Sequence, residues 1–150
     1  MVITTPYFIP DDAFLQAMQT AVLRGVEVHL VVSRKADQLL VGLAQRSYYE
    51  GLLEAGVFIH LYKRRFLHAK HVSIDDTIVL IGSSNMDMRS FQLNAEISLL
   101  VFDAKVAAAL HAVQDRNFAQ ADLLTLEDWQ KRPALARISQ NLARLVDSVL

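Results

Sequence analysis

The sequence predicts one α/β domain over residues 1–150, built on a mixed β-sheet flanked by helices on both faces. Through residue 62, strand-like and helix-like segments alternate, and helical crossovers of this kind favour parallel strands covered on both faces. Three strand-like runs follow, the first two joined by a tight turn, and these favour antiparallel pairing. With 53% hydrophobic and 21% charged residues, the 150-residue chain can bury one substantial core.

The first half is expected to fold as strand, helix, strand, helix, strand. Segment 2–9 is β-branched and aromatic, which predicts a strand that Pro10 closes. Asp11 and Asp12 provide an N-cap with acids in the first turn of a helix, and Gly25 ends it. The elements expected next are a strand over 26–32, a helix over 37–55 ended by Gly56, and a strand over 57–62.

The second half is expected to add three strands and then helices. The strand-like runs cover 67–74, 77–82 and 94–102, and the Asp75-Asp76 turn makes the first two a hairpin. The helical segments are 103–120, a piece around Trp129 capped by Thr125, and 133–149. The last helix has an apolar stripe that we expect to pack on its own domain, with bilayer contact as the alternative; the stripe comprises Leu135, Ile138, Leu142, Leu145 and Val149.

Bulk composition excludes several classes of protein. A formal charge of -1 provides no basic footprint for a general nucleic-acid binder, so no nucleic-acid partner is expected. The absence of cysteine excludes disulfides and thiolate metal sites. No apolar run of about 18 residues is present to span a bilayer, so the chain is expected to be soluble by itself.

Polar side chains gather around the predicted hairpin. Residues i and i+2 of a strand share a face, so His68 and Lys70 project together while His71 points the other way. The same alternation over 94–102 places Glu96 among apolar residues. An unpaired buried carboxylate is costly, so Glu96 needs a partner, and the ring N–H of His68 would serve.

The segment GSSN, residues 82–85, adds anion-binding groups. Gly82 allows a sharp turn, after which backbone N–H groups, the Ser83 hydroxyl and the Asn85 amide can face an anion. With the point charge of Lys70 they form a phosphate cradle in which His68 is the reactive nitrogen. The plainer alternative is that His68 and Lys70 are edge-strand polar residues and Glu96 is a salt-bridge partner.

The combination resembles the signature of the phospholipase D superfamily. The pattern HxKxxxxD is present at His68, Lys70 and Asp75, followed by GSxN at 82–85 and a downstream acid at Glu96. The surrounding segments ITTPYFIPDDAFLQAM, LLEAGVFIHLY and GSSNMDMRSFQLNAEISLLVFD are similar to the C-terminal half of bacterial cardiolipin synthases. This resemblance runs from residue 3 to the end of the chain.

The resemblance implies a phospholipase D-like fold and transfer of a phosphatidyl group through a covalent phosphohistidine, without a metal or other cofactor. Two HxK motifs would meet at one site, where one histidine attacks phosphorus and the other protonates the leaving alcohol. His68 would be nucleophile or general acid, and the C-terminal histidine of such pairs is usually the acid.

The remaining roles follow from the same resemblance. Lys70 and Asn85 would bind the non-bridging phosphate oxygens, with Ser83 supporting them. Glu96 would orient His68. Asp75 and Gly82 belong to the motif with structural roles.

The chain contains a single HxK motif. The residues two positions after the other four histidines are Val31, Tyr62, Ser73 and Val113. Half of a two-histidine site is therefore missing, and it would come from a second copy or from an N-terminal segment of a longer chain. We expect the latter, so the isolated chain should be inactive unless it dimerises.

Three functions remain open from the sequence. The first is half of a cardiolipin synthase that acts on phosphatidylglycerol or another anionic phospholipid, at the bacterial inner membrane in the full-length protein. The second is a homodimeric phosphodiesterase or nuclease of the same superfamily. The third is a folded half without catalysis, which the intact motif disfavours.

Four further features have two readings each. Lys63-Arg64-Arg65 is either a solvated loop or an attractor for anionic headgroups. Asp87 and Arg89, which resemble the family's loop after GSxN, are expected to form a structural ion pair rather than to take part in catalysis. Tyr7 and Phe8 either line a lipid pocket or pack in the core. A metal site at His68 and His71 is disfavoured, since alternate strand residues face opposite ways.

Overall fold

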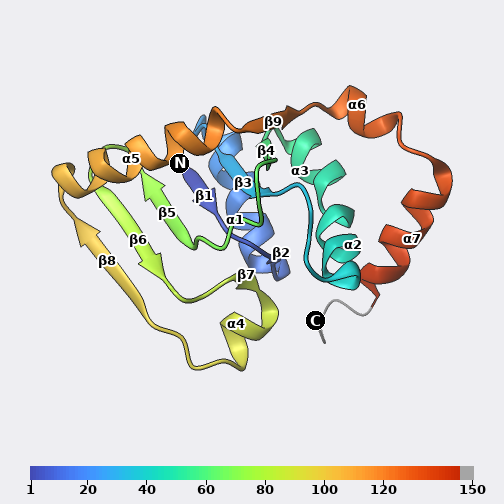
Figure 1. The fold of residues 1–150 in the computed structure, drawn as a ribbon, viewed down its shortest axis with the longest axis horizontal. Helices are drawn as coiled ribbons and strands as arrows, with labels where there is room; N and C mark the ends of the chain where they lie inside the picture. Colours follow the sequence, from blue (N-terminus) through green and yellow to red (C-terminus); the bar gives the residue numbers. More distant parts are fainter. Residues whose placement is uncertain (146–150) are drawn as a thin grey trace.

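The computed structural model describes residues 1–145, whose strands form a seven-stranded sheet and a two-stranded sheet (Figure 1). The strands are β1 (Val2–Thr4), β2 (Phe8–Ile9), β3 (His29–Ser33), β4 (Phe58–Tyr62), β5 (His71–Ile74), β6 (Ile78–Gly82), β7 (Met86–Asp87), β8 (Ser98–Phe102) and β9 (Ala121–Leu124). The helices are α1 (Asp12–Leu23), α2 (Leu39–Ser47), α3 (Tyr49–Ala55), α4 (Met88–Gln92), α5 (Ala104–Phe118), α6 (Leu126–Gln130) and α7 (Ala134–Arg144).

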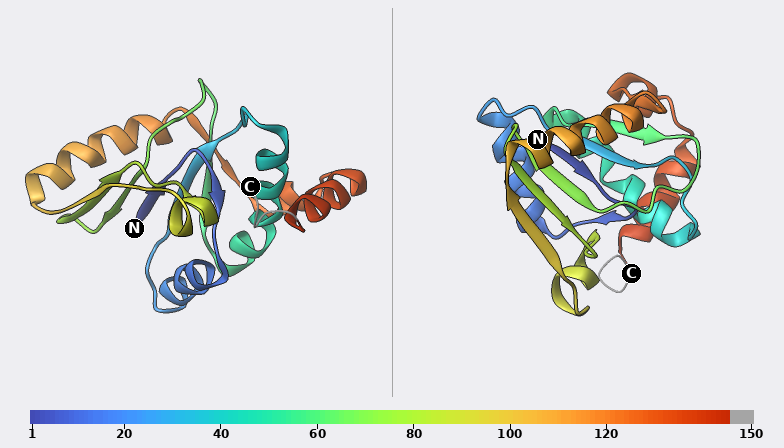
Figure 2. Two further views of the ribbon diagram at one scale, coloured as in Figure 1. Left: turned by 90° about the horizontal axis from the view of Figure 1, so that it is seen from below. Right: turned by 60° about the vertical axis from the view of Figure 1, so that its left-hand side comes forward.

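The large sheet is mixed, as the sequence predicted. Its order is β8-β6-β5-β1-β3-β4-β9, and the pairs β1–β3 and β3–β4 are parallel. The other four pairs are antiparallel, including the predicted β5–β6 hairpin. The long helix α5 lies along one face of this sheet, and α1 and α3 lie on the opposite face (Figure 2).

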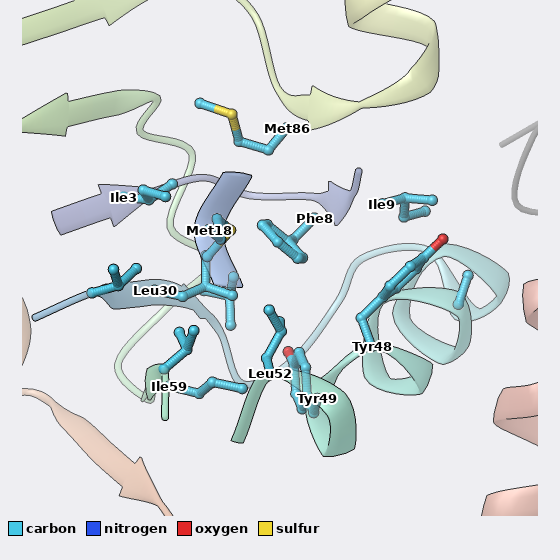
Figure 3. Packing of buried hydrophobic residues seen from close by; sticks show 14 of the residues in the cluster. Ile3, Phe8, Ile9, Met18, Leu30, Tyr48, Tyr49, Leu52, Ile59 and Met86 are labelled. Carbon is cyan, nitrogen blue, oxygen red and sulfur yellow. The ribbon is translucent and has the colours of Figure 1, made fainter. Parts of the chain in front are cut away.

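The main core fills the space between the sheet and helices α1, α2 and α3 (Figure 3). Leu30 and Ile59 from the central parallel strands are fully buried there, against Met18 of α1 and Leu52 of α3. Alternation along β3 sends the neighbouring Val31 to the other face. Burying both faces of the central strands explains why their sequences read as continuous apolar runs.

The predicted strand 2–9 is divided, because the chain leaves the large sheet at Thr5. The Thr5 hydroxyl donates to the Tyr7 carbonyl at 2.7 Å and accepts the Met86 N–H at 3.2 Å. Pro6 has no N–H to continue a ladder. The following residues form β2, which pairs in parallel with β7 as a separate small sheet.

Three short elements were not predicted, and several predicted elements have different bounds. The helix over 37–55 is two helices, α2 and α3, that meet at Tyr48. The strands β7 and β9 and the helix α4 have weak local signals, and β9 (ADLL) forms because it pairs with the edge of β4. The runs 67–74 and 94–102 enter the sheet only at His71 and Ser98.

The expectation that the apolar stripe of the last helix packs on its own domain is wrong for the described part of α7. Its members Leu135, Ile138, Leu142 and Leu145 are 80%, 56%, 59% and 78% exposed. The helix instead buries Gln140 and Ala143 and packs against α2. Gln140 is tolerated there because its side-chain oxygen accepts from Arg132 at 3.2 Å. Val149 lies outside the described residues.

One edge of the large sheet exposes apolar side chains. Strand β8 is an edge of the large sheet, and Leu99 and Phe102 on it are 65% and 70% exposed. Among residues 1–145, no helix combines the length and apolarity needed to cross a bilayer.

His71 gives the fold a pH dependence. Its ring is buried under α5, with Nδ1 at 3.4 Å from Gln114 Nε2, and Nε2 has no hydrogen-bond partner among residues 1–145. Burial disfavours the imidazolium and lowers the pKa of His71 from 6.5 to about 4. The unfolded chain therefore binds a proton between pH 6.5 and 4 that the folded chain does not, and stability falls as the pH falls through this range.

We predict that His71→Gln flattens this dependence by removing up to about 3 kcal/mol of proton linkage near pH 4. Urea unfolding at pH 7, 6, 5 and 4.5 measures it, with His111→Gln on α5 as the control. Some slope should persist, since burial and then the neighbouring His29 lower the pKa of His60 to about 4 as well. Parallel profiles for wild type and His71→Gln would contradict the assignment.

Candidate active site

His68 and Lys70 lie in an extended segment just before β5 and share one side of the chain. The Lys70 Nζ lies 3.0 Å from His68 Nε2, whereas His71 points into the core. An ammonium has only donors, so with Lys70 charged the ring nitrogen at this distance accepts. The segment is held to the hairpin by the Gly82 N–H, which donates to the Lys70 carbonyl at 3.2 Å.

A row of aromatic rings supports the His68 side chain. The Phe66 ring stacks on the His68 ring with centroids 5.9 Å apart, and the Tyr7 ring lies 5.8 Å from Phe66. The Tyr7 hydroxyl donates to the Asp37 carboxylate at 2.8 and 2.9 Å. Burial, followed by this carboxylate, raises the pKa of Tyr7 to about 12. Tyr7 is thus fixed beside the motif, while Phe8 is a core residue.

Gly82 is required because β8 approaches its backbone, rather than because the chain turns there. Gly82 pairs with Ser98, and a Cβ at this position would lie 2.6 Å from the Ile97 carbonyl oxygen and overlap the Ser98 hydroxyl. The loop leaves β6 immediately afterwards. The Ser83 N–H donates to the Ile97 carbonyl at 2.9 Å, and the Ile97 N–H donates to Ser83 Oγ at 3.0 Å.

The expected hydrogen bond between Glu96 and the His68 ring is wrong. The Glu96 carboxylate accepts from the Ser83 hydroxyl, from Ser90 Oγ at 3.3 Å and from Asn94 Nδ2 at 3.4 Å. The expectation assumed that 94–102 is all strand, but the chain is irregular until Ser98, so strand alternation does not apply to Glu96.

Glu96 and the motif residue Lys70 interact electrostatically. The Ser83 hydrogen bond is the main cause that lowers the pKa of Glu96, and the nearby Lys70 charge acts in the same direction. Partial burial lowers the pKa of Lys70, and the charges of Glu96 and Asp87 oppose that shift. A partly desolvated ammonium attracts an anion more strongly than a fully hydrated one, so Lys70 is suited to contact a phosphate.

Asn85 faces a polar cavity of about 120 Å³ whose lining includes Tyr7, Arg89 and Asn94. Its Oδ1 is buried with no hydrogen-bond partner in the described part of the chain. Buried amide oxygens are seldom left unpaired, so this side chain has hydrogen-bonding capacity to spare. Its backbone N–H is already used, because it donates to Ser90 Oγ at 3.2 Å.

Ser90 is a site residue that the sequence analysis missed. Its hydroxyl contacts both Glu96 and the Asn85 backbone, so it links the two sides of the loop. The signal available was Asp87, which N-caps α4 by accepting the Ser90 N–H at 2.7 Å. The expected ion pair between Asp87 and Arg89 is wrong, because none forms within residues 1–145.

Two further features complete the site. Asp75 lies in the exposed β5–β6 turn with a φ of 49°, a left-handed conformation that aspartate tolerates. An apolar cavity of about 180 Å³ adjoins Lys70, Gly82 and Ser84. In the described range, no group of three or more His, Asp or Glu side chains is arranged to hold a metal ion.

Comparison with known proteins identifies one family. A family model described as cardiolipin synthase, phospholipase D-like domain, matches residues 1–117. Cardiolipin synthase A of Serratia proteamaculans is 45% identical over 142 residues, and that of Klebsiella pneumoniae is 44% identical. Each alignment covers 95% of this chain, and the chain spans 29% of the length of these relatives.

Solved structures share the fold. Phosphatidylserine synthase of Haemophilus influenzae superposes with a TM-score of 0.76 at 20% identity, covering 99% of this chain and 41% of that one. The phospholipase D family member Nuc of Salmonella typhimurium superposes with a TM-score of 0.70 at 18% identity, covering 82% of this chain and 80% of that one. The fold expected from the sequence is therefore confirmed.

The hydrogen bonds of Glu96 predict that Glu96→Gln lowers catalytic turnover. One carboxylate oxygen becomes an NH2 group, so either Ser83 on one oxygen, or Ser90 and Asn94 on the other, lose their acceptor, and the loop that carries Asn85 should shift. Catalytic turnover of the assembled enzyme should fall roughly tenfold to a hundredfold, the range expected for a small misplacement of site groups. The exposed Glu54→Gln is the control. Unchanged turnover in Glu96→Gln would show that these hydrogen bonds do not position the site.

Proposed function

The chain belongs to the cardiolipin synthase family of phospholipase D-like domains, and on that premise we propose that it forms half of the active site of a phosphatidyltransferase. The proposed reaction joins two phosphatidylglycerol molecules and releases glycerol. The observation that carries the proposal is the 3.0 Å approach of Lys70 Nζ to His68 Nε2, beside a loop that offers Asn85.

The reaction needs two histidines in sequence. One ring nitrogen attacks the phosphorus of the first lipid, forming an N–P bond as the P–O bond to glycerol breaks. The departing oxygen takes a proton from the second histidine. The hydroxyl of the second lipid then returns a proton to that histidine while its oxygen attacks phosphorus, and the N–P bond breaks. The products are cardiolipin, glycerol and the original enzyme.

We assign His68 the proton-transfer role and the companion HxK histidine the attack. Lys70 and the Asn85 amide would contact the non-bridging oxygens of the transferred phosphate, where negative charge is highest. Glu96 would act as a positioning residue, through Ser83 and through its charge beside Lys70, because its hydrogen bonds go to the loop. No residue of this scheme requires a metal.

The partners follow from the chemistry. The substrates are anionic phospholipids, so the assembled enzyme would work at a membrane surface, for which we propose the bacterial inner membrane. The second HxK half would come from the same longer chain, since the chain spans 29% of the length of its relatives. The net charge of -1 counts against a general nucleic-acid partner.

A homodimeric phosphodiesterase or nuclease is the second candidate. It is favoured by the single HxK motif together with the Nuc structure, of which this chain covers 80%. Two copies of His68 could meet across a two-fold axis and build a symmetric site.

The role of His68 predicts a dependence on the leaving group. In the assembled enzyme, His68→Ala should slow glycerol release from phosphatidylglycerol roughly 10²–10⁴-fold, since an alkoxide leaves poorly without a proton. A nitrophenyl phosphodiester should lose far less, because nitrophenolate needs no proton. Initial rates for both substrates, with His111→Ala as the control, provide the measurement. Equal losses on both substrates would identify His68 as the nucleophile instead.

The single motif predicts that residues 1–150 alone are inactive as a monomer. Without a second histidine the chain lacks either the nucleophile or the acid, and a missing acid alone costs roughly 10²-fold. Solution mass and hydrolysis of a phosphodiester should be measured together. Activity from a confirmed monomer would contradict the two-histidine mechanism. Activity from a dimer that His68→Ala abolishes would favour the homodimeric phosphodiesterase.

A further inference from the structure

A cluster of cationic side chains surrounds a cavity next to the candidate active site. This cavity measures about 310 Å³, and its lining includes Lys35, Lys63, Arg64, Arg65 and Phe66. The three consecutive basic residues lie in the loop between β4 and the His68 segment, and Lys35 follows β3. Because β3 and β4 are adjacent and parallel, their ends bring the two loops together.

Most of these cations lack a counter-ion. Lys63 binds Asp122 at 2.6 Å, but Lys35, Arg64 and Arg65 form no ion pair among residues 1–145. The carboxylate in the lining, Asp37, accepts the Tyr7 hydroxyl. In a chain with a net charge of -1, this concentration of unpaired positive charge around a concave surface favours an anion.

The Phe66 ring separates the cavity from His68. Phe66 lines the cavity and stacks on His68 with ring centroids 5.9 Å apart. Phe66 also contacts Tyr7, which lines the polar cavity of Asn85. An anion in the basic cavity would therefore sit beside the transferred phosphate while remaining separate from the ligands Lys70 and Asn85.

The acceptor lipid has a group that matches this position. Its attacking hydroxyl is joined to its own phosphorus by five bonds, which span roughly 6 Å when extended. When this hydroxyl attacks the phosphorus held beside His68, the acceptor phosphorus therefore lies within roughly 6 Å of the attacking oxygen. The two phosphates are both anionic, so the second needs its own counter-charge.

We propose that the cavity of Lys35, Arg64 and Arg65 binds the phosphodiester of the acceptor phosphatidylglycerol, an inference that rests on the proposed function. Arginine suits this task, because its planar donors match phosphate oxygens. The cavity thereby selects an acceptor that carries its own phosphate over a neutral alcohol, while donor binding stays with Lys70 and Asn85.

The test compares two acceptors for the same donor in the assembled enzyme. Cardiolipin formation in phosphatidylglycerol vesicles uses an anionic acceptor, and exchange of labelled glycerol into phosphatidylglycerol uses a neutral one. The double variant Arg64→Gln with Arg65→Gln should lower cardiolipin formation roughly tenfold or more, as expected for lost hydrogen bonds to a charged group. Glycerol exchange should change less than twofold, since it needs only the donor site.

A matched control separates the cavity from general attraction to an anionic membrane. Arg24→Gln with Arg116→Gln removes the same charge from two exposed positions outside the cavity. This control should keep both reactions at the wild-type rate, and it should bind phosphatidylglycerol vesicles as the wild type does. If it lowers cardiolipin formation as much as the cavity variant, membrane attraction explains the effect and the proposal fails. Equal losses of both reactions in the cavity variant, or no loss of either, also overturn it.

Added inorganic phosphate distinguishes the source of the anion. Cardiolipin formation by the wild type should resist millimolar phosphate if the cavity takes a lipid-borne phosphodiester. Inhibition that the cavity variant lacks would assign the cavity to free phosphate and overturn the lipid assignment. A wild-type enzyme that neither exchanges glycerol nor forms cardiolipin would instead refute the proposed function itself.

Discussion

The position of the candidate site depends on Thr5, a fully buried residue that joins the two sheets. Its N–H donates to the Val31 carbonyl at 3.2 Å, so its backbone still belongs to the large sheet. Its hydroxyl accepts from the Met86 N–H and donates to the Tyr7 carbonyl, so its side chain belongs to the small one. Through these bonds the chain after β1 and the loop after β6 meet at one place, although more than 80 residues separate them. Hydrogen bonds of this kind contribute about 1 kcal/mol each, but leaving their buried partners unpaired costs more.

Local signals in the sequence were sufficient for much of this arrangement. Asp11, Asp103 and Thr125 cap helices as their residue types suggest, and Gly56 ends α3 with a φ of 95°. The HxK and GSxN segments were recognised by their resemblance to the phospholipase D signature, and the β5–β6 hairpin lies between them. What the sequence did not predict depends on contacts between distant segments. The small sheet requires Thr5 and Met86 to meet, and Glu96 turns to Ser83 because β8 starts later than its apolar pattern suggests.

In the last helix, a strong sequence signal led to a wrong prediction of packing. Its apolar stripe is a strong periodic signal, and burial of such a stripe is the usual outcome. The neighbouring α2 instead selects the face with the small side chain of Ala143, which permits close approach, and satisfies Gln140 through Arg132. Helix packing depends on the shape of both surfaces, and a single periodicity describes only one of them.

The exposed edge of the large sheet has a consequence for handling the isolated chain. Strand β8 leaves one row of backbone N–H and C=O groups without a neighbouring strand in the described sheet. Proteins commonly block such an edge with a lysine, a proline or a bulge, because an open edge is a template for aggregation. The sequence of β8 is SLLVF, which contains no charged residue and no proline. Nothing in the strand itself opposes edge-to-edge pairing, so we expect copies of the isolated chain to associate through this strand at high concentration.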